Sequence, residues 1–227
     1  MKTYPVIKLT KAVATAITGS VTQTTKMPCK SYSLPTLACK TGSKMAQLPG
    51  SICASCYAMK GNYAKYAATV EPSQHARLDA VMQAHDNPEP WLTAMATHIG
   101  TDAEFRWHDS GDLQSVKHLR LICMVAIETP NCDHWLPTRE YGMVKEYLDL
   151  YGELPANLTI RLSAMYVDKD VVVPASLQNV AGVEVSNVHS KTGAPVGTVC
   201  RAPDTGGKCG ACRACFTRSG PVSYAFH

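Results

Sequence analysis

Eight of the ten cysteines in this chain stand in two quartets, one toward each end. The quartets are Cys29, Cys39, Cys53 and Cys56, and after a long gap Cys200, Cys209, Cys212 and Cys215. The segment from Met1 to Pro5 has no apolar block followed by a small-residue cleavage site, so we expect no secretory signal and a reducing cytoplasm. There, closely spaced cysteines are usually metal ligands or redox groups, whereas in a secreted chain the same set predicts disulfides.

The C-terminal quartet has the more specific spacing. Its last three members are separated by two residues each, and Gly206, Gly207 and Gly210 stand beside them. This run resembles the cysteine run that ligates a cubane in bacterial ferredoxins, and glycines let backbone amides approach the inorganic sulfides. We therefore predict a [4Fe–4S] cluster here in preference to zinc, which more often takes paired cysteine knuckles.

The N-terminal quartet has one close pair, Cys53-x2-Cys56, and its other two members must fold back to reach that pair. Thiolates bind both iron–sulfur clusters and zinc, so a further cluster and a zinc ion stay open for this quartet. Mixed quartets also stay open, because proximity along the chain does not decide which thiolates meet in space. The two remaining cysteines are predicted not to be ligands. Cys123 lies on the apolar face of a predicted helix, and Cys132 has no partner at ligand spacing.

The rest of the composition is that of an ordinary globular protein, with 45% hydrophobic and 18% charged residues. We expect one domain over residues 1–227, in which cysteine-rich segments 1–70 and 191–227 enclose the segment 71–190. The longest apolar stretch, 119–127, is far too short for a membrane span. The net charge of +4 is compatible with nucleic-acid binding but does not argue for it, because no dense basic run exists.

The middle segment alternates short β-branched or apolar runs with helical spacing. The predicted strands are 103–107, 134–137, 158–162 and 183–185, with a further strand near 21–26, and the predicted helices are 71–85, 90–99, 116–128 and 141–151. Successive strands start about 25 residues apart, the length of a strand plus a crossover helix. The sequence therefore predicts a single-domain α/β fold with a mainly parallel sheet, either an open layer or an incomplete (β/α) barrel.

A polar cluster follows each predicted strand. The clusters are His108–Asp112, Thr138–Glu140, Ser163–Met165 and Ser186–His189. Each cluster alone is explained by helix capping or turn formation. Because the carboxyl ends of parallel strands face one crevice, we predict that the four clusters together form a shared site.

Candidate roles follow from the side chains of these clusters. We expect His108 to act as acid or base near neutral pH, with Asp109 and Asp112 orienting it or binding a hard cation. Arg139 can grip a carboxylate or phosphate through its planar fork, with Glu140 beside it. The alternative is that Asp109, Arg139 and Glu140 pair with one another and only stabilise the crevice.

Two further residues, Ser163 and Asn187, are predicted to contact a cofactor, because they stand in the clusters after the third and fourth strands.

Several motifs together resemble the bacteriophage gene product 88 family, over about residues 26 to 216. They are Lys26–Cys29, Ser33–Pro35, Cys53–Ala58 with Gly61 and Tyr63, Phe105–Asp112, Trp135–Glu140 and Lys208–Cys215. The resemblance implies a phage origin and a cysteine-rich α/β protein acting in the host cytoplasm. It implies no particular activity.

The Cys53-x2-Cys56-Tyr57 segment and the repeating βα units are also distantly similar to radical S-adenosylmethionine enzymes. Those enzymes hold a [4Fe–4S] cluster by three cysteines and use the open iron to cleave their cofactor. In this chain Pro49 stands where the first cysteine of their motif would be.

Two functions are therefore carried forward. The first is an iron–sulfur redox protein or enzyme whose substrate or redox partner the sequence does not name. The second is a non-enzymatic, metal-stapled module that binds nucleic acid or a host protein. It is suggested by Tyr57, Tyr63 and Tyr66, which alternate with Lys60 and Lys65.

Overall fold

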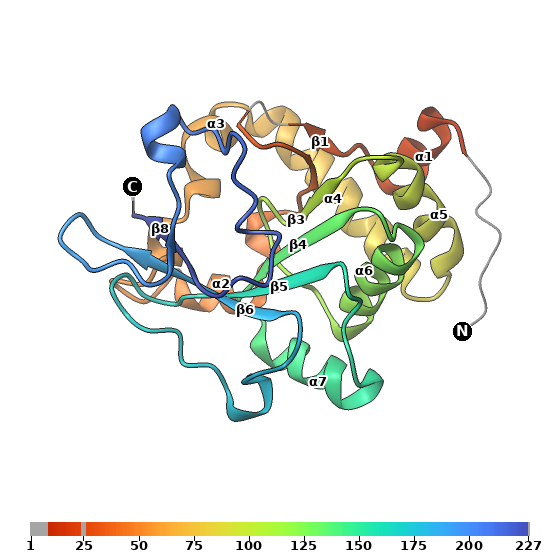
Figure 1. The fold of residues 1–227 in the computed structure, drawn as a ribbon. Coiled ribbons are helices and arrows are strands. Elements are labelled where there is room, and N and C mark those ends of the chain that lie inside the picture. The colour runs from red at the N-terminus through yellow and green to blue at the C-terminus, as the bar shows by residue number, and fades with distance from the viewer. Residues whose placement is uncertain (1–8, 24–25, 227) are drawn as a thin grey trace.

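The computed structural model describes residues 9–23 and 26–226, which form an α/β fold around one eight-stranded sheet (Figure 1). Its strands are β1 (Thr22–Gln23), β2 (Lys30–Tyr32), β3 (Glu104–Trp107), β4 (Asp133–Thr138), β5 (Leu158–Ser163), β6 (Val183–His189), β7 (Thr198–Val199) and β8 (Val222–Ala225). The order across the sheet is β1-β2-β3-β4-β5-β6-β8-β7. Apart from the β1–β2 pair every pairing is parallel, which confirms the predicted fold class. The sheet is open, because its two outermost strands, β1 and β7, do not pair with each other.

Seven α-helices and five 3-10 turns lie among the described residues. The helices are α1 (Lys11–Thr18), α2 (Lys40–Met45), α3 (Gly61–Lys65), α4 (Ala67–Ala84), α5 (Pro88–Ile99), α6 (Val116–Glu128) and α7 (Tyr141–Tyr151). The 3-10 turns are η1 (Thr36–Ala38), η2 (Cys53–Ser55), η3 (Tyr57–Met59), η4 (Ala175–Leu177) and η5 (Ala202–Thr205). The four predicted helices are confirmed as α4 to α7. However, α4 starts earlier than predicted, so Pro72 lies inside it rather than in its first turn, at the cost of one backbone hydrogen bond.

The six central parallel strands, β2, β3, β4, β5, β6 and β8, follow one another in chain order. Right-handed crossovers between strands that advance in one direction place their helices on one face of the sheet. Figure 1 shows α4, α5 and α6 together on that side, and the C-terminal segment, drawn in blue, on the other. The second face therefore has to be covered by segments that are not crossover helices.

The helix-covered face carries the main hydrophobic core. Alternate residues of the strands, among them Phe105, Trp107 and Leu136, are fully buried there against the helices. Trp91 of α5 stacks on Trp107 with ring centroids 6.1 Å apart. No helix among the described residues is long and apolar enough to cross a membrane.

The other face, which we call the polar face, carries the alternate strand residues Ser31, Arg106, Trp135, Thr159 and Arg161. Arg161 is completely buried, and its guanidinium donates to five backbone carbonyls. These carbonyls belong to Val185, Ala214, Cys215, Thr217 and Gly220, at 2.6 to 3.1 Å. This one side chain thereby fastens the C-terminal cysteine segment to the middle of the sheet.

Candidate metal centres

Three cysteines converge after β2, and we call Cys39, Cys53 and Cys56 the three-cysteine group. A Cβ placed on Gly42 would lie 3.6 Å from Cys39 Sγ and 3.7 Å from Cys53 Sγ. Burial raises the pKa of Cys39 well above its ordinary value, and the charges of Asp112, Cys56 and Cys53 raise it further. The thiols of Cys39 and Cys53 are therefore protonated until a metal displaces their protons.

The three-cysteine group lies at the carboxyl ends of the central strands. Glu140, which follows β4, accepts hydrogen bonds from Thr41 N at 2.7 Å and Thr41 Oγ1 at 2.9 Å, and so holds the start of α2 next to Cys39. Asp112 accepts from Thr138 Oγ1 at 2.6 Å and ties the ends of β3 and β4 together. Burial raises the pKa of Asp112 to about 6. Both carboxylates are thus engaged in positioning the site.

Arg139 is the cation of this site. Its Nε donates to the carbonyl of Ala164 at 3.0 Å, which fixes the plane of the guanidinium at the end of β5. Burial raises the pKa of Cys53, and the positive charge of Arg139 acts against that rise. Within the described residues Nη1 and Nη2 of Arg139 have no hydrogen-bond partner, so this edge of the fork is available to an anion beside the thiols.

Cys29 belongs with the C-terminal quartet, and we call the resulting set of Cys29, Cys200, Cys209, Cys212 and Cys215 the five-cysteine group. The backbone N–H of Cys209 donates to Lys26 O at 3.1 Å, so the segment before β2 lies beside the C-terminal cysteine segment. Cys200 and Cys212 contribute to the raised pKa of Cys209, and Cys209 contributes to that of Cys29, although burial is the first cause in both.

Of the groupings that the sequence leaves open, the structure has a mixed one, in which Cys29 lies with the C-terminal cysteines rather than with Cys39, Cys53 and Cys56. Cys29 directly precedes β2, whereas Cys39 and its two partners follow it. Cys29 therefore lies at the start of β2, and Cys39 and its partners lie beyond its carboxyl end. Cys29 packs instead with Trp135, Phe216 and the partly buried Cys215.

A row of buried donors without partners crosses the polar face beside this group. Ser31 pairs with Arg106, and Arg106 with Trp135, in the register of three neighbouring strands. Ser31 Oγ, Arg106 Nε and Trp135 Nε1 have no hydrogen-bond partner among the described residues. Buried donors normally have a hydrogen-bond acceptor, so we expect an acceptor to bind beside this row. Thiolate and sulfide sulfurs are acceptors of that kind, and the donor set fits a thiolate-bound cluster.

No three His, Cys, Asp or Glu side chains in the described part of the chain are arranged to hold a single metal ion. A zinc site brings four ligands within about 2.3 Å of one point. In a cubane each thiolate binds a different iron, so its ligand sulfurs need not meet around one point.

Two of the predicted catalytic residues, His108 and Asp109, have their closest side-chain partners outside the three-cysteine group. His108 has a φ of 53° and turns its ring toward His118 of α6, with ring centroids 5.2 Å apart. Burial lowers the pKa of His108 to about 3, so its ring is neutral. The backbone carbonyl of Asp109 accepts from the hydroxyl of Tyr57, and its Oδ2 accepts from Tyr63 at 3.0 Å.

The two predicted cofactor contacts, Ser163 and Asn187, do not meet. Ser163 is the last residue of β5 and pairs in register with Ser186. Asn187 is next along β6, so its side chain points to the opposite face from Ser163. The predicted polar cluster Ser186–His189 is thus part of β6 rather than the loop after it, because the strand is longer than its apolar core.

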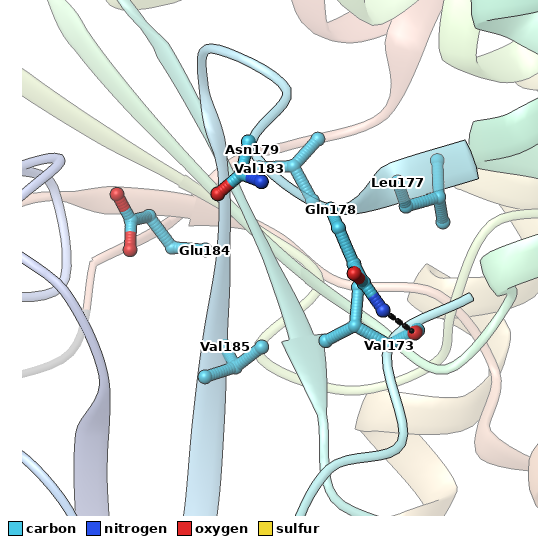
Figure 2. Close-up of a pocket in the computed structure, with 7 residues that line it drawn as sticks. All are labelled: Val173, Leu177, Gln178, Asn179, Val183, Glu184 and Val185. Atoms are coloured by element: carbon cyan, nitrogen blue, oxygen red, sulfur yellow. Dashed lines mark hydrogen bonds between the residues drawn. The ribbon is translucent and has the colours of Figure 1, made fainter. Parts of the chain in front are cut away.

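A pocket of about 250 Å³ lies elsewhere, between β6 and the segment before it (Figure 2). Val173, Leu177 and Gln178 line it, and Gln178 Nε2 donates to Val173 O at 3.0 Å. Figure 2 shows Glu184 pointing away from these residues, across the strand. No cysteine lines this pocket.

Sequence reasoning missed three residues that build the five-cysteine group, Arg106, Trp135 and Arg161. Arg106 and Arg161 each alternate along their strands with buried apolar residues. Strict alternation indicates a strand with two different faces. Applied to β3 and β5, this signal would have pointed to a second, polar face.

Comparison with known proteins gives one match. A family model described as Gene product 88 covers residues 7–218. No curated protein and no solved structure matches the chain. With most of its length matched, the chain belongs to the Gene product 88 family of bacteriophage proteins.

Proposed function

We propose that this protein is an iron–sulfur redox protein or enzyme with two clusters. A [4Fe–4S] cluster at the five-cysteine group would be held by Cys200, Cys209, Cys212 and Cys215, with Cys29 packed beside Cys215, and would transfer electrons. A second cluster, at the three-cysteine group, would have one iron without a protein ligand. The observation that carries the proposal is that Cys29 lies with the C-terminal cysteines. Only Cys39, Cys53 and Cys56 therefore remain beside Arg139, and three thiolates leave one iron of a cubane without a protein ligand.

The three-cysteine group has the surroundings of a reaction site. An iron without a protein ligand can bind a small molecule and act as a Lewis acid or electron donor. Arg139 offers two unpartnered nitrogens beside the thiols, which suits a carboxylate or phosphate on that molecule. Glu140 and Asp112 hold the surrounding strand ends in place.

A relationship to the radical S-adenosylmethionine fold is part of this proposal. Its support is the three-thiolate set after the first parallel strand and the chain-order sequence of parallel strands. We place the protein in the cytoplasm of the phage's host, where thiols stay reduced.

Anaerobic purification followed by analysis of iron, acid-labile sulfide and zinc tests the two-cluster proposal. Two cubanes predict about eight irons and eight sulfides per chain. Cys53→Ala and Cys212→Ala should each remove about half of the iron, whereas Cys123→Ala, in the helix-covered core, should remove none. Zinc without sulfide would refute the iron–sulfur proposal at both sites.

In that case the second candidate, a metal-stapled module, takes its place. Two of the tyrosines on which its nucleic-acid contact was predicted, Tyr57 and Tyr63, have their hydroxyls bound to Asp109. Tyr66 is 52% exposed and stays available for stacking on a base.

A further inference from the structure

One edge of the five-cysteine group reaches the surface. Cys212 is exposed, as are its neighbours Gly210 and Ala211, whereas Cys29 on the inner side is only 5% exposed. A redox centre with one accessible edge can exchange electrons with a partner that docks there, and its buried side keeps solvent out.

The surface around Cys212 is basic. Residues 200–219 contain the cations Arg201, Lys208, Arg213 and Arg218 and one acid, Asp204. Arg201 pairs with Asp204 at 2.9 Å, and Arg213 pairs with Glu104 at 2.7 Å.

Two exposed lysines on this surface are unpaired. The Nζ of Lys26 lies 3.2 Å from where a Cβ on Gly207 would stand, which brings this lysine next to Lys208 and Cys209. In the part of the chain that the structure describes, neither Lys26 nor Lys208 has an acidic partner. The surface therefore complements an acidic partner.

A chain of contacts leads from this group to the three-cysteine group. Arg106 lies beside Cys29, whose raised pKa its positive charge opposes, and its guanidinium reaches Met27 Sδ at 2.9 Å. On its other side, Arg106 Nη2 lies 3.5 Å from the hydroxyl of Tyr57, which directly follows Cys56. Arg106 thus lies between Cys29 of the five-cysteine group and Tyr57, the chain neighbour of Cys56.

We infer that the five-cysteine group takes up single electrons from an acidic, ferredoxin-type carrier docked around Cys212 and relays them through Arg106 and Tyr57 to the three-cysteine group. This inference rests on the proposed function. The thiolates of the five-cysteine group would hold the first electron acceptor and those of the three-cysteine group the second. In one transfer the carrier would lose one electron, the first acceptor would pass it on, and the second would keep it. No bond or proton would change place in this step.

The docking surface is tested by charge reversal. Chain with both clusters, confirmed by iron and sulfide analysis, is mixed with a reduced acidic [2Fe–2S] ferredoxin, and the reduction of its clusters is followed by stopped-flow absorbance. The double variant Lys26→Glu with Lys208→Glu should slow the second-order rate by about tenfold or more at low salt. The difference should vanish at high salt.

Lys117→Glu is the matched control, because Lys117 is 65% exposed on α6, which covers the other face of the sheet. Its rate should equal that of the unchanged chain. Dithionite, a small reductant that needs no docking surface, should reduce all three proteins to the same final extent. A double variant that is fully loaded with clusters and still accepts electrons from ferredoxin at the unchanged rate overturns the docking surface.

The relay is tested separately with Tyr57→Phe, which keeps the ring and removes the hydroxyl near Arg106. Freeze-quenched electron paramagnetic resonance should show the five-cysteine cluster reduced at the usual rate and the three-cysteine cluster reduced several-fold more slowly. Equal rates for both clusters in this variant overturn the relay. Absence of iron and sulfide from the unchanged chain is a different result, which refutes the proposed function itself.

Discussion

The buried guanidinium of Arg161 supports a quantitative prediction for the variant Arg161→Met. The substitution keeps the apolar volume and removes the donors to five carbonyls. Each carbonyl left dry and unpartnered costs about 1–3 kcal/mol. Thr217 is exposed, so water can replace the donor there, and the variant also avoids the cost of burying a charge.

If two of the other four carbonyls stay dry, the loss is about 2–6 kcal/mol. Methionine carries no charge, so the variant does not have to bury one, and this offsets part of the loss. We therefore expect the free energy of unfolding to fall by about 3 kcal/mol. Urea denaturation followed by circular dichroism under anaerobic conditions measures it, and the melting temperature should fall by about 6–12 °C.

Arg120→Met is the control for this variant. Arg120 is exposed on α6 and lies 5.0 Å from the ring centre of Tyr151, so its loss should cost less than about 0.5 kcal/mol. A fall of less than about 1 kcal/mol for Arg161→Met would refute the claim that this residue fastens the C-terminal segment to the sheet.

Two further predictions concern pH and the strand ends. Burial lowers the pKa of His108 to about 3, of His134 to about 4 and of His118 well below its usual value, so below pH 6.5 the unfolded chain binds three protons that the folded chain does not. Asp112, with its pKa raised to about 6, opposes one of them, so we expect stability to fall by about 3 kcal/mol per pH unit from pH 6 to 4 in urea titrations. Glu140→Gln should lower stability by about 1–2 kcal/mol and deplete iron from the three-cysteine group, whereas the exposed control Glu146→Gln should do neither in the same assays.

Much of the sheet and most of its helices were predictable, because their signals are local. β4 and β5 and the helices α5 to α7 carry apolar residues at clear strand or helix spacing, and their bounds agree with the prediction to within a few residues. α1 was missed: Thr10 caps it, with its side chain accepting from Val13 N at 3.3 Å, but its eight residues are shorter than the window of about 11–18 residues over which helical spacing is counted.

The division of the cysteines could not be predicted, because it depends on which end of a strand each cysteine adjoins. β2 has three residues, too few to show alternation, so nothing in the sequence signals that the chain crosses the sheet between Cys29 and Cys39. The position of Asn187 was missed for a related reason. Polar residues at the end of β6 resemble a loop until their pairing with β8 is known.

The contact between Lys26 and Cys209 has a consequence for biosynthesis. Most of the chain lies between these two residues, so their pairing closes a long loop, whose entropic cost grows slowly with its length. During translation, Cys39, Cys53 and Cys56 leave the ribosome early, whereas Cys29 waits for its partners until the last part of the chain has emerged. A metal that binds the five-cysteine group would therefore bind last, and its uptake would mark the completion of folding.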